Sequence, residues 1–289
     1  MTTREQWIAG ARPKTLPAAI APVLVGTAFA GYNATVLHTF LALVVALGLQ
    51  VGVNYANDYS DGIKGTDTDR IGPMRLVGSG AATPKDVRNA AIISFLIAAT
   101  AGLVISSRTS WLLLIVGALA IVAAWTYTGG PKPYGYQALG EVSVFIFFGI
   151  VATVGTYYIQ VESVSREVLL ASFAMGALAC AILVLNNLRD LEKDQVADKK
   201  TLAVVMGDQS TRDLYKWLMF FALVMSVVLT FFSYFYLFAL ISLPLISKSV
   251  RSVSAGAHGP ALIELLAKTG RIQIIYAAAL SFAALLVAR

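Results

Sequence analysis

Long apolar stretches without charge alternate with short polar segments along the whole chain. A helix needs about 20 apolar residues to cross a bilayer, and nine stretches come close to that length. They cover residues 16–33, 37–58, 88–107, 109–129, 138–160, 168–188, 214–232, 234–250 and 270–288. The uncharged stretch 218–247 is too long for one crossing at about 1.5 Å per residue, so we divide it near Ser233; eight spans is the alternative. The pattern predicts an all-α polytopic membrane protein with about nine transmembrane helices in one domain, residues 1–289.

The composition agrees with a membrane protein and narrows its chemistry. Hydrophobic residues make up 57% of the chain and charged residues 13%, and the mean hydropathy is +0.73. Soluble domains carry about 25% charged residues. The single cysteine, Cys180, excludes an internal disulfide. The two histidines, His38 and His258, lie far apart in sequence, so we do not expect a zinc site.

The basic residues are distributed unevenly between the two sides of the predicted bundle. With the N-terminus inside, 19 of the 22 lysines and arginines fall on the inner side, and only Arg108, Arg166 and Arg289 fall outside. Cytoplasmic loops carry such an excess. We therefore expect a cell inner (plasma) membrane protein whose N-terminus and longest loops, about 59–87 and 189–213, are cytoplasmic. Topology and phosphate binding explain the net charge of +6 better than nucleic-acid binding does.

Two acidic clusters repeat the same arrangement, each at the end of an apolar stretch. The first contains Asn54, Asn57, Asp58 and Asp61, and the second contains Asn186, Asn187, Asp190 and Asp194. Side chains three or four positions apart share a helix face, so each cluster can present two carboxylates and an amide oxygen to one point. Four predicted spans separate the clusters, which places both on the cytoplasmic side. Such oxygen-rich sites suit Mg²⁺ bound through carboxylates and substrate phosphates, and the pair indicates a diphosphate substrate.

Cations accompany both clusters and can bind phosphate oxygens. Lys64, Arg70 and Arg75 follow the first cluster, whereas Arg189, Lys193, Lys199 and Lys200 surround the second. We favour Lys64, Arg70, Arg189 and Lys193 as diphosphate ligands because they lie nearest the acids in sequence. Anchoring of the cytoplasmic loops is the alternative for some of these cations. Asp67 and Asp69 can join the site or belong to a solvated loop, and the sequence does not decide between these readings.

A third feature is the segment 127–141, which joins two spans on the same side as the acids. Tyr127, Tyr134 and Tyr136 can line an aromatic pocket or stabilise a carbocation with their ring faces. An aromatic belt at the membrane interface explains them equally well. Glu141 lies just inside a predicted span, where a carboxylate is costly, so we expect it to be functional or part of a polar network.

These motifs together resemble the UbiA superfamily of intramembrane prenyltransferases over nearly the full length of the chain, and within it the naphthoate branch. The matching segments are 11–17, 57–67, 70–80, 127–141, and 186–190 followed by 200–204. Either acidic cluster alone would indicate only the superfamily. Two positions depart from the family pattern: Gly65 stands where the wider superfamily often has Asp, and Asp198 stands where the branch has Gly.

The resemblance implies a bundle of nine spans around a central cavity that opens to lipid. It also implies Mg²⁺ dependence, with metal and diphosphate held by Asn57, Asp58, Asp61, Asp190 and Asp194. The implied reaction joins the prenyl group of a polyprenyl diphosphate to 1,4-dihydroxy-2-naphthoate with loss of carbon dioxide, in menaquinone biosynthesis. The alternatives are a related transferase acting on 4-hydroxybenzoate, chlorophyllide or a glycerol-phosphate lipid, and a transporter whose duplicated acids bind a coupling cation.

Overall fold

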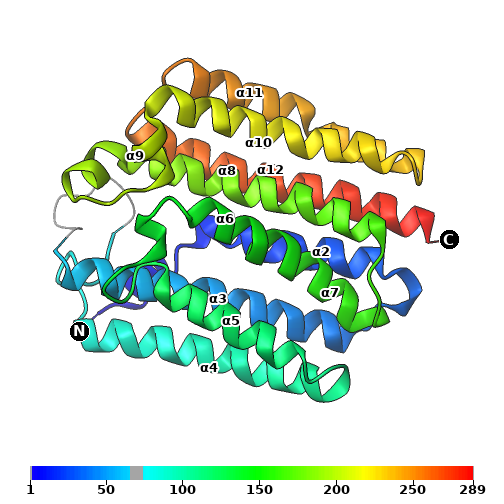
Figure 1. The fold of residues 1–289 in the computed structure, drawn as a ribbon, viewed down its shortest axis with the longest axis horizontal. Helices are drawn as coiled ribbons and strands as arrows, with labels where there is room; N and C mark the ends of the chain where they lie inside the picture. Colours follow the sequence, from blue (N-terminus) through cyan, green and yellow to red (C-terminus); the bar gives the residue numbers. More distant parts are fainter. Residues whose placement is uncertain (1, 66–73, 289) are drawn as a thin grey trace.

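The computed structural model describes residues 2–65 and 74–288, and this part of the chain is a helical bundle without strands (Figure 1). Its elements in chain order are α1 (Arg4–Gly10), η1 (Pro13–Thr15), α2 (Pro17–Phe29), η2 (Gly31–Asn33), α3 (Val36–Ile63), α4 (Pro84–Arg108), α5 (Leu113–Thr126), η3 (Tyr134–Tyr136), α6 (Gly140–Val144), η4 (Phe145–Val151), α7 (Ala152–Val161), α8 (Arg166–Val196), α9 (Leu202–Met206), α10 (Asp208–Leu229), η5 (Tyr234–Ser242), α11 (Leu243–Ser254) and α12 (Pro260–Val287).

Each predicted span coincides with a helix or with helices joined end to end, so the all-helical prediction is confirmed. The fifth span comprises α6, the π-helical η4 and α7, and the eighth comprises η5 and α11. Ser233 caps the start of η5, which places the division of the long uncharged stretch where it was expected. Among the described residues, six of these helical segments are long and apolar enough to cross a membrane, and α2 and α5 are shorter apolar helices.

Several boundaries differ from the apolar pattern because helices continue into the polar segments. α8 ends at Val196, beyond the expected end at residue 188, and α12 begins at Pro260 instead of residue 270. No proline or glycine interrupts 189–196, whose residues are mostly good helix formers. The expected long loop 189–213 is therefore largely helical. This extension matters because it places Asp190 and Asp194 on a rigid helix.

The core is organised around α8, whose middle is buried on all sides. It packs against α10, α12, α2 and η4. Alanines spaced three residues apart, such as Ala171, Ala174 and Ala177, are fully buried. Small residues let membrane helices approach closely. At Gly149 of η4 an added Cβ would lie 2.5 Å from the Cα of Gly176 in α8. The two backbones are thus in direct contact, and any larger side chain there would separate η4 from α8.

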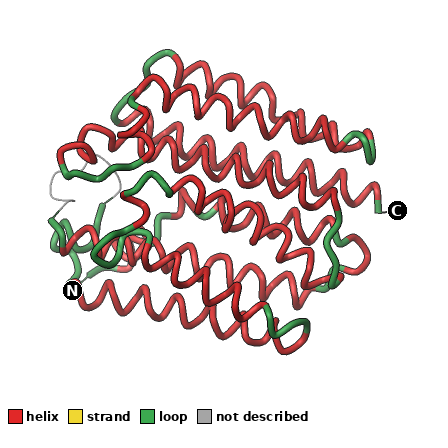
Figure 2. Tube along the Cα trace, in the orientation of Figure 1, coloured by secondary structure: helices red, strands yellow, loops and turns green. Residues whose placement is uncertain are grey.

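α3 and α4 form a second, antiparallel pair along one side of the bundle (Figure 1). Gly48 faces Ala98, and Gly52 faces the ring of Phe95. At the end of this pair where α3 stops, α8 also stops, and the loops 64–65, 74–83, 127–139 and 197–201 gather there (Figure 2). We call this the carboxylate end of the bundle and the opposite one the distal end. A backbone hydrogen bond from Ala138 to the carbonyl of Lys200, 2.8 Å long, joins two of these loops.

Candidate active site

A cavity of about 360 Å³ connects the carboxylate end to the interior of the bundle. Apolar side chains of α3, α5, η4 and α7 form most of its wall. Its polar end is lined by side chains of both acidic clusters, by several cations and by tyrosines of the 127–136 segment. The side chains from the two acidic clusters that line it are Asn54, Asn57, Asp61, Asn186, Asn187, Asp190 and Asp194. The fold therefore brings the two clusters, expected to act together, to one end of one cavity.

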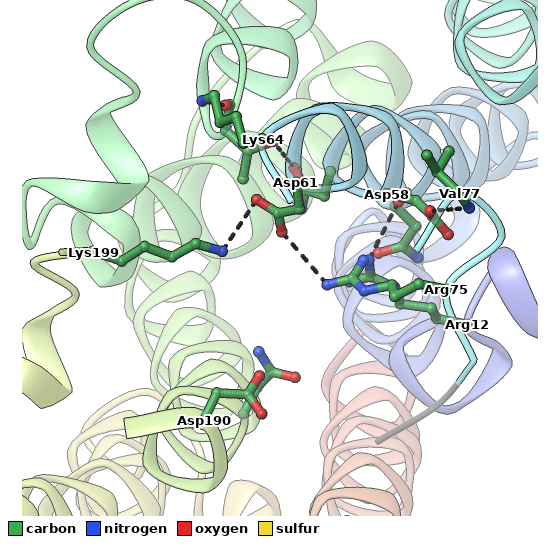
Figure 3. A network of polar contacts seen from close by, with 12 residues as sticks. Arg12, Asp58, Asp61, Lys64, Arg75, Val77, Asp190 and Lys199 are labelled. Atoms are coloured by element: carbon green, nitrogen blue, oxygen red, sulfur yellow. Dashed lines mark hydrogen bonds and ion pairs between the residues drawn. The ribbon is translucent and has the colours of Figure 1, made fainter. Parts of the chain in front are cut away.

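Asp61 is the centre of the polar network in the first cluster. Its carboxylate lies 3.2 Å from the Lys199 ammonium and 3.7 Å from the Arg75 guanidinium (Figure 3). The hydroxyl of Tyr136 also donates to it. All of these side chains are buried or half-buried, and a buried carboxylate is costly unless cations pair with it in this way. Asp61 joins α3, the loop before α4 and the segment after α8.

Asn57, one turn before Asp61 on the same helix face, presents its amide to the cavity as well. Its Oδ1 accepts a hydrogen bond of 2.7 Å from the Thr128 hydroxyl. Asn54 lies a turn deeper and holds the N-terminal segment, because its Nδ2 donates to the carbonyl of Ala11 (2.9 Å) and to the Thr15 hydroxyl (3.2 Å). Asn54 therefore shapes the cavity wall and ties η1 to α3.

Asp58 does not share the position of Asp61, although the sequence pattern grouped them as paired metal ligands. Its two carboxylate oxygens accept hydrogen bonds from the backbone N–H groups of Leu76 (2.8 Å) and Val77 (3.0 Å). Asp58 is not one of the described residues that line the cavity. Asp58 points instead at the segment that carries Arg75 (Figure 3). In this arrangement Asp58 fixes that segment against α3, because both of its carboxylate oxygens accept hydrogen bonds from the segment's backbone.

In the second cluster, Asp190 and Asp194 lie one turn apart on α8 and both line the cavity. Arg189 holds Asp190 with two hydrogen bonds, from Nε at 2.8 Å and from Nη2 at 2.7 Å. The same Nη2 donates to Asn186 Oδ1 at 2.9 Å. Lys193, also expected near the diphosphate, lines the cavity beside them. The cluster therefore combines two carboxylates with cations on a single helix.

Tyr136 stands between two lysines that come from distant parts of the chain. The ammonium of Lys64 lies 5.0 Å from the ring centroid and that of Lys199 lies 4.9 Å from it. Lys64 also donates to the carbonyl of Thr128 at 2.8 Å, and the partial loss of water around its ammonium lowers the pKa of Lys64 from its usual value. The sequence pattern placed Tyr136 among the tyrosines that can line an aromatic pocket, and it counted Lys199 among the cations around the second cluster without favouring it as a diphosphate ligand. Lys199 follows α8 at a spacing that gives no hint of Asp61, so only the fold identifies it.

The tyrosines expected around the substrate occupy the wall near the carboxylates. Tyr127 and Tyr134 meet edge to face with ring centroids 5.5 Å apart, and both line the cavity. The Tyr134 hydroxyl binds Ser143 Oγ at 2.8 Å and donates to the carbonyl of Ala123 at 2.9 Å. Burial raises the pKa of Tyr134, so this side chain remains a neutral phenol at physiological pH.

Glu141 belongs to a buried network behind the cavity wall. Its Oε1 accepts a hydrogen bond of 2.9 Å from Asn187 Nδ2, and the thiol of Cys180 lies 3.1 Å from its carbonyl oxygen. Asn187 lines the cavity, and Glu141 is not among the described residues that do. Glu141 thus orients Asn187 so that the amide oxygen is left for the cavity. Asp67 and Arg70, two further expected site residues, lie outside the described part of the chain.

The model of the UbiA prenyltransferase family matches residues 19–255, which is most of the chain. The chain belongs to the UbiA prenyltransferase family. It is 48% identical over 283 residues to the 1,4-dihydroxy-2-naphthoate octaprenyltransferase of Mycobacterium tuberculosis, with 97% of each protein covered. It is 37% identical over 277 residues to the enzyme of the same name from Escherichia coli, with 92% of this chain and 90% of the relative covered. As a member of this family with several long apolar helices, the protein is a multi-pass membrane protein.

The fold of solved UbiA proteins agrees with this assignment. The structure of a UbiA homolog from Archaeoglobus fulgidus bound to DMAPP and Mg²⁺ superposes with a TM-score of 0.68 at 17% identity, covering 97% of this chain and 99% of that chain. A UbiA homolog from Aeropyrum pernix gives a TM-score of 0.71 at 15% identity, covering 96% and 98%. These similarities show that the UbiA fold extends over almost the whole chain.

The oxygen donors of this UbiA site suit Mg²⁺ that is shared with a substrate. Asn57 with Asp61, and Asp190 with Asp194, form two pairs that line one cavity from two different helices. Within the described residues, no three acidic, cysteine or histidine side chains form a ready-made metal site. Mg²⁺ commonly binds through one or two carboxylates, water and substrate phosphates. The residues present therefore fit metal ions that are completed by a diphosphate.

Proposed function

We propose that this chain transfers a polyprenyl group from polyprenyl diphosphate to 1,4-dihydroxy-2-naphthoate, with loss of carbon dioxide and with Mg²⁺ as cofactor. This is a step of menaquinone biosynthesis. The observation that carries the proposal is the meeting of both acidic clusters and their cations at the end of one apolar cavity. Full-length similarity to two naphthoate octaprenyltransferases supports the same acceptor and a long-chain donor.

The diphosphate binds at the carboxylate end, where Asn57, Asp61, Asp190 and Asp194 would hold Mg²⁺ against it. Bound Mg²⁺ would neutralise the charge that develops on the departing diphosphate. Lys199 and Arg75 pair with Asp61 in this structure, and Arg189 pairs with Asp190. When the acids bind metal, these cations are placed to bind the diphosphate oxygens instead. Lys64 and Lys193 add positive charge at the same end.

The prenyl chain extends from there into the apolar part of the cavity. Breaking the bond between C1 and the diphosphate oxygen leaves the electron pair on the diphosphate and a positive charge on the allylic chain. The rings of Tyr127, Tyr134 and Tyr136 line the polar end of the cavity, where this bond breaks, and can stabilise that charge. Holding donor and acceptor in line in a mostly apolar cavity supplies much of the rate increase.

The acceptor reacts at the ring carbon that carries its carboxylate. A carbon–carbon bond forms between this carbon and C1 of the prenyl chain. The bond to the carboxylate then breaks, its electron pair returns to the ring, and carbon dioxide leaves. Because the carboxylate is replaced by the prenyl group, the ring regains its aromatic form. The product is the prenylated dihydroxynaphthalene, demethylmenaquinol.

Product analysis of the purified protein tests this proposal. The protein is incubated with Mg²⁺, a polyprenyl diphosphate and dihydroxynaphthoate labelled in its carboxyl group. We expect one labelled carbon dioxide for each diphosphate released, and little release without the donor. The Asp190→Asn variant is the matched control for background. A product that keeps its carboxylate, or turnover with 4-hydroxybenzoate in preference to dihydroxynaphthoate, would exclude the proposed acceptor.

A further inference from the structure

Three glycines inside helices differ from the other helical glycines that the structure describes. Glycine in a helix interior is less favourable than alanine, so it usually has a packing reason. Gly48 and Gly149, for example, have neighbouring helices within 3.0 Å of the position of an added Cβ. At Gly102, Gly117 and Gly155, a Cβ would meet nothing within 4 Å. Other described glycines with such open space have positive φ and form turns.

All three open glycines line the same cavity, although they belong to three different helices. Gly102 lies on α4, Gly117 on α5 and Gly155 on α7. Each lies within about two turns of the distal end of its helix. The glycines therefore face the cavity at one common depth, together with apolar neighbours such as Ile105 and Ile159. A shared depth on three helices is not explained by helix packing, since nothing packs against these positions.

This depth is far from the site of bond breakage. Gly48 faces Ala98, so Gly102 lies about one turn beyond the level of Gly48 in the antiparallel pair α3 and α4. The distance along α3 from Asp61 to the level of Gly102 is about 25 Å at 1.5 Å per residue. The hydrocarbon core of a bilayer is about 30 Å thick. A chain that starts at the carboxylate end would thus cross most of the membrane before it reaches the glycines.

We propose that Gly102, Gly117 and Gly155 form a distal chamber that receives the far end of the prenyl chain and sets the longest donor that the enzyme accepts. This inference rests on the proposed function. The ligand it implies is a long, methyl-branched hydrocarbon, because the chamber is apolar and its width depends on missing side chains. A short donor ends before the chamber, so only the chains of long donors contact these three glycines.

Leucine at one of the three glycines tests the chamber. In Gly117→Leu we expect kcat/KM for octaprenyl diphosphate to fall by about tenfold or more, because the new side chain displaces several buried methylene groups. The value for geranyl diphosphate should stay within about twofold of the parent. The control is Ala118→Leu, the next residue on α5, which is exposed and is not among the residues that line the cavity. Leucine is a good helix former, so neither variant weakens α5.

Gly102→Leu and Gly155→Leu should show the same selectivity, since they face the same chamber. Equal losses for both donors, or no loss for either in all three variants, would overturn the inference. Binding provides a readout that is independent of turnover: the melting temperature of the parent protein in Mg²⁺ should rise more with octaprenyl than with geranyl diphosphate, and Gly117→Leu should lose that difference. A parent protein that binds selectively but forms no product would refute the proposed function and leave the chamber supported; no selectivity in the parent's binding would refute the chamber.

Discussion

The Lys199 ammonium lies 3.2 Å from the Asp61 carboxylate, although 138 residues separate the two positions. The contact joins the end of α3 to the segment after α8, and both side chains are buried. A buried acid that keeps its charge needs such a partner. The pair thus holds the two halves of the site together, and under the proposed function it would open when Asp61 binds Mg²⁺.

Breaking this pair should have different effects on stability and on turnover. We expect Asp61→Asn to lower kcat on the order of 100-fold or more, because it removes a metal-side charge. Lys199→Met should mainly raise the KM for the diphosphate donor. In a double-mutant cycle of thermal stability without Mg²⁺, the two substitutions should couple by about 0.5–3 kcal/mol. Additive effects of the two changes would contradict a direct interaction.

Asp58→Asn should behave unlike Asp61→Asn, because Asp58 binds backbone N–H groups of Leu76 and Val77. An amide places an N–H group against one of these donors, which should destabilise the protein by about 1–3 kcal/mol. Activity should fall through a higher KM, since the segment that carries Arg75 loses its support. The Mg²⁺ concentration for half-maximal activity should stay near that of the parent. A large rise in that concentration would instead make Asp58 a direct metal ligand.

Glu141 should act through Asn187, whose amide it orients. Glu141→Leu leaves the buried Asn187 N–H group without its acceptor, at a cost of about 1–3 kcal/mol, and should lower kcat/KM. Glu141→Gln keeps an acceptor oxygen and should restore most of the activity. The Mg²⁺ dependence of turnover is measured alongside and should not change. If Glu141→Gln were as inactive as Glu141→Leu, the carboxylate itself would have a role in the reaction.

The orientation of the bundle can be tested with single cysteines introduced after Cys180→Ala removes the buried native thiol. Lys64 and Lys200 lie exposed at the carboxylate end, and Val164 lies exposed at the distal end. In intact cells we expect an impermeant thiol reagent to label Val164→Cys but not Lys64→Cys or Lys200→Cys. Inside-out vesicles should give the reverse result. Labelling of Lys64→Cys from outside would place the site on the opposite side of the membrane.

The sequence alone was sufficient for the properties that depend on neighbouring residues. Apolar length fixed the spans, because every backbone polar group in lipid must be satisfied within a helix. Helical spacing placed Asn57 beside Asp61 and Asp190 beside Asp194, and positional matches identified the family. These features repeat at short range, so a linear pattern contains them.

Only the tertiary structure decided which side chains meet across the bundle. Asp58 and Asp61 are three residues apart on one helix. Asp58 nevertheless accepts hydrogen bonds from loop backbone, whereas Asp61 pairs with Lys199 and Arg75. Nothing near Glu141 in sequence points to Asn187, and nothing distinguishes Gly117 from a packing glycine such as Gly48. The physical reason is the same in each case. A side chain's role depends on which helix faces it, and that is set by close packing between segments far apart in the chain.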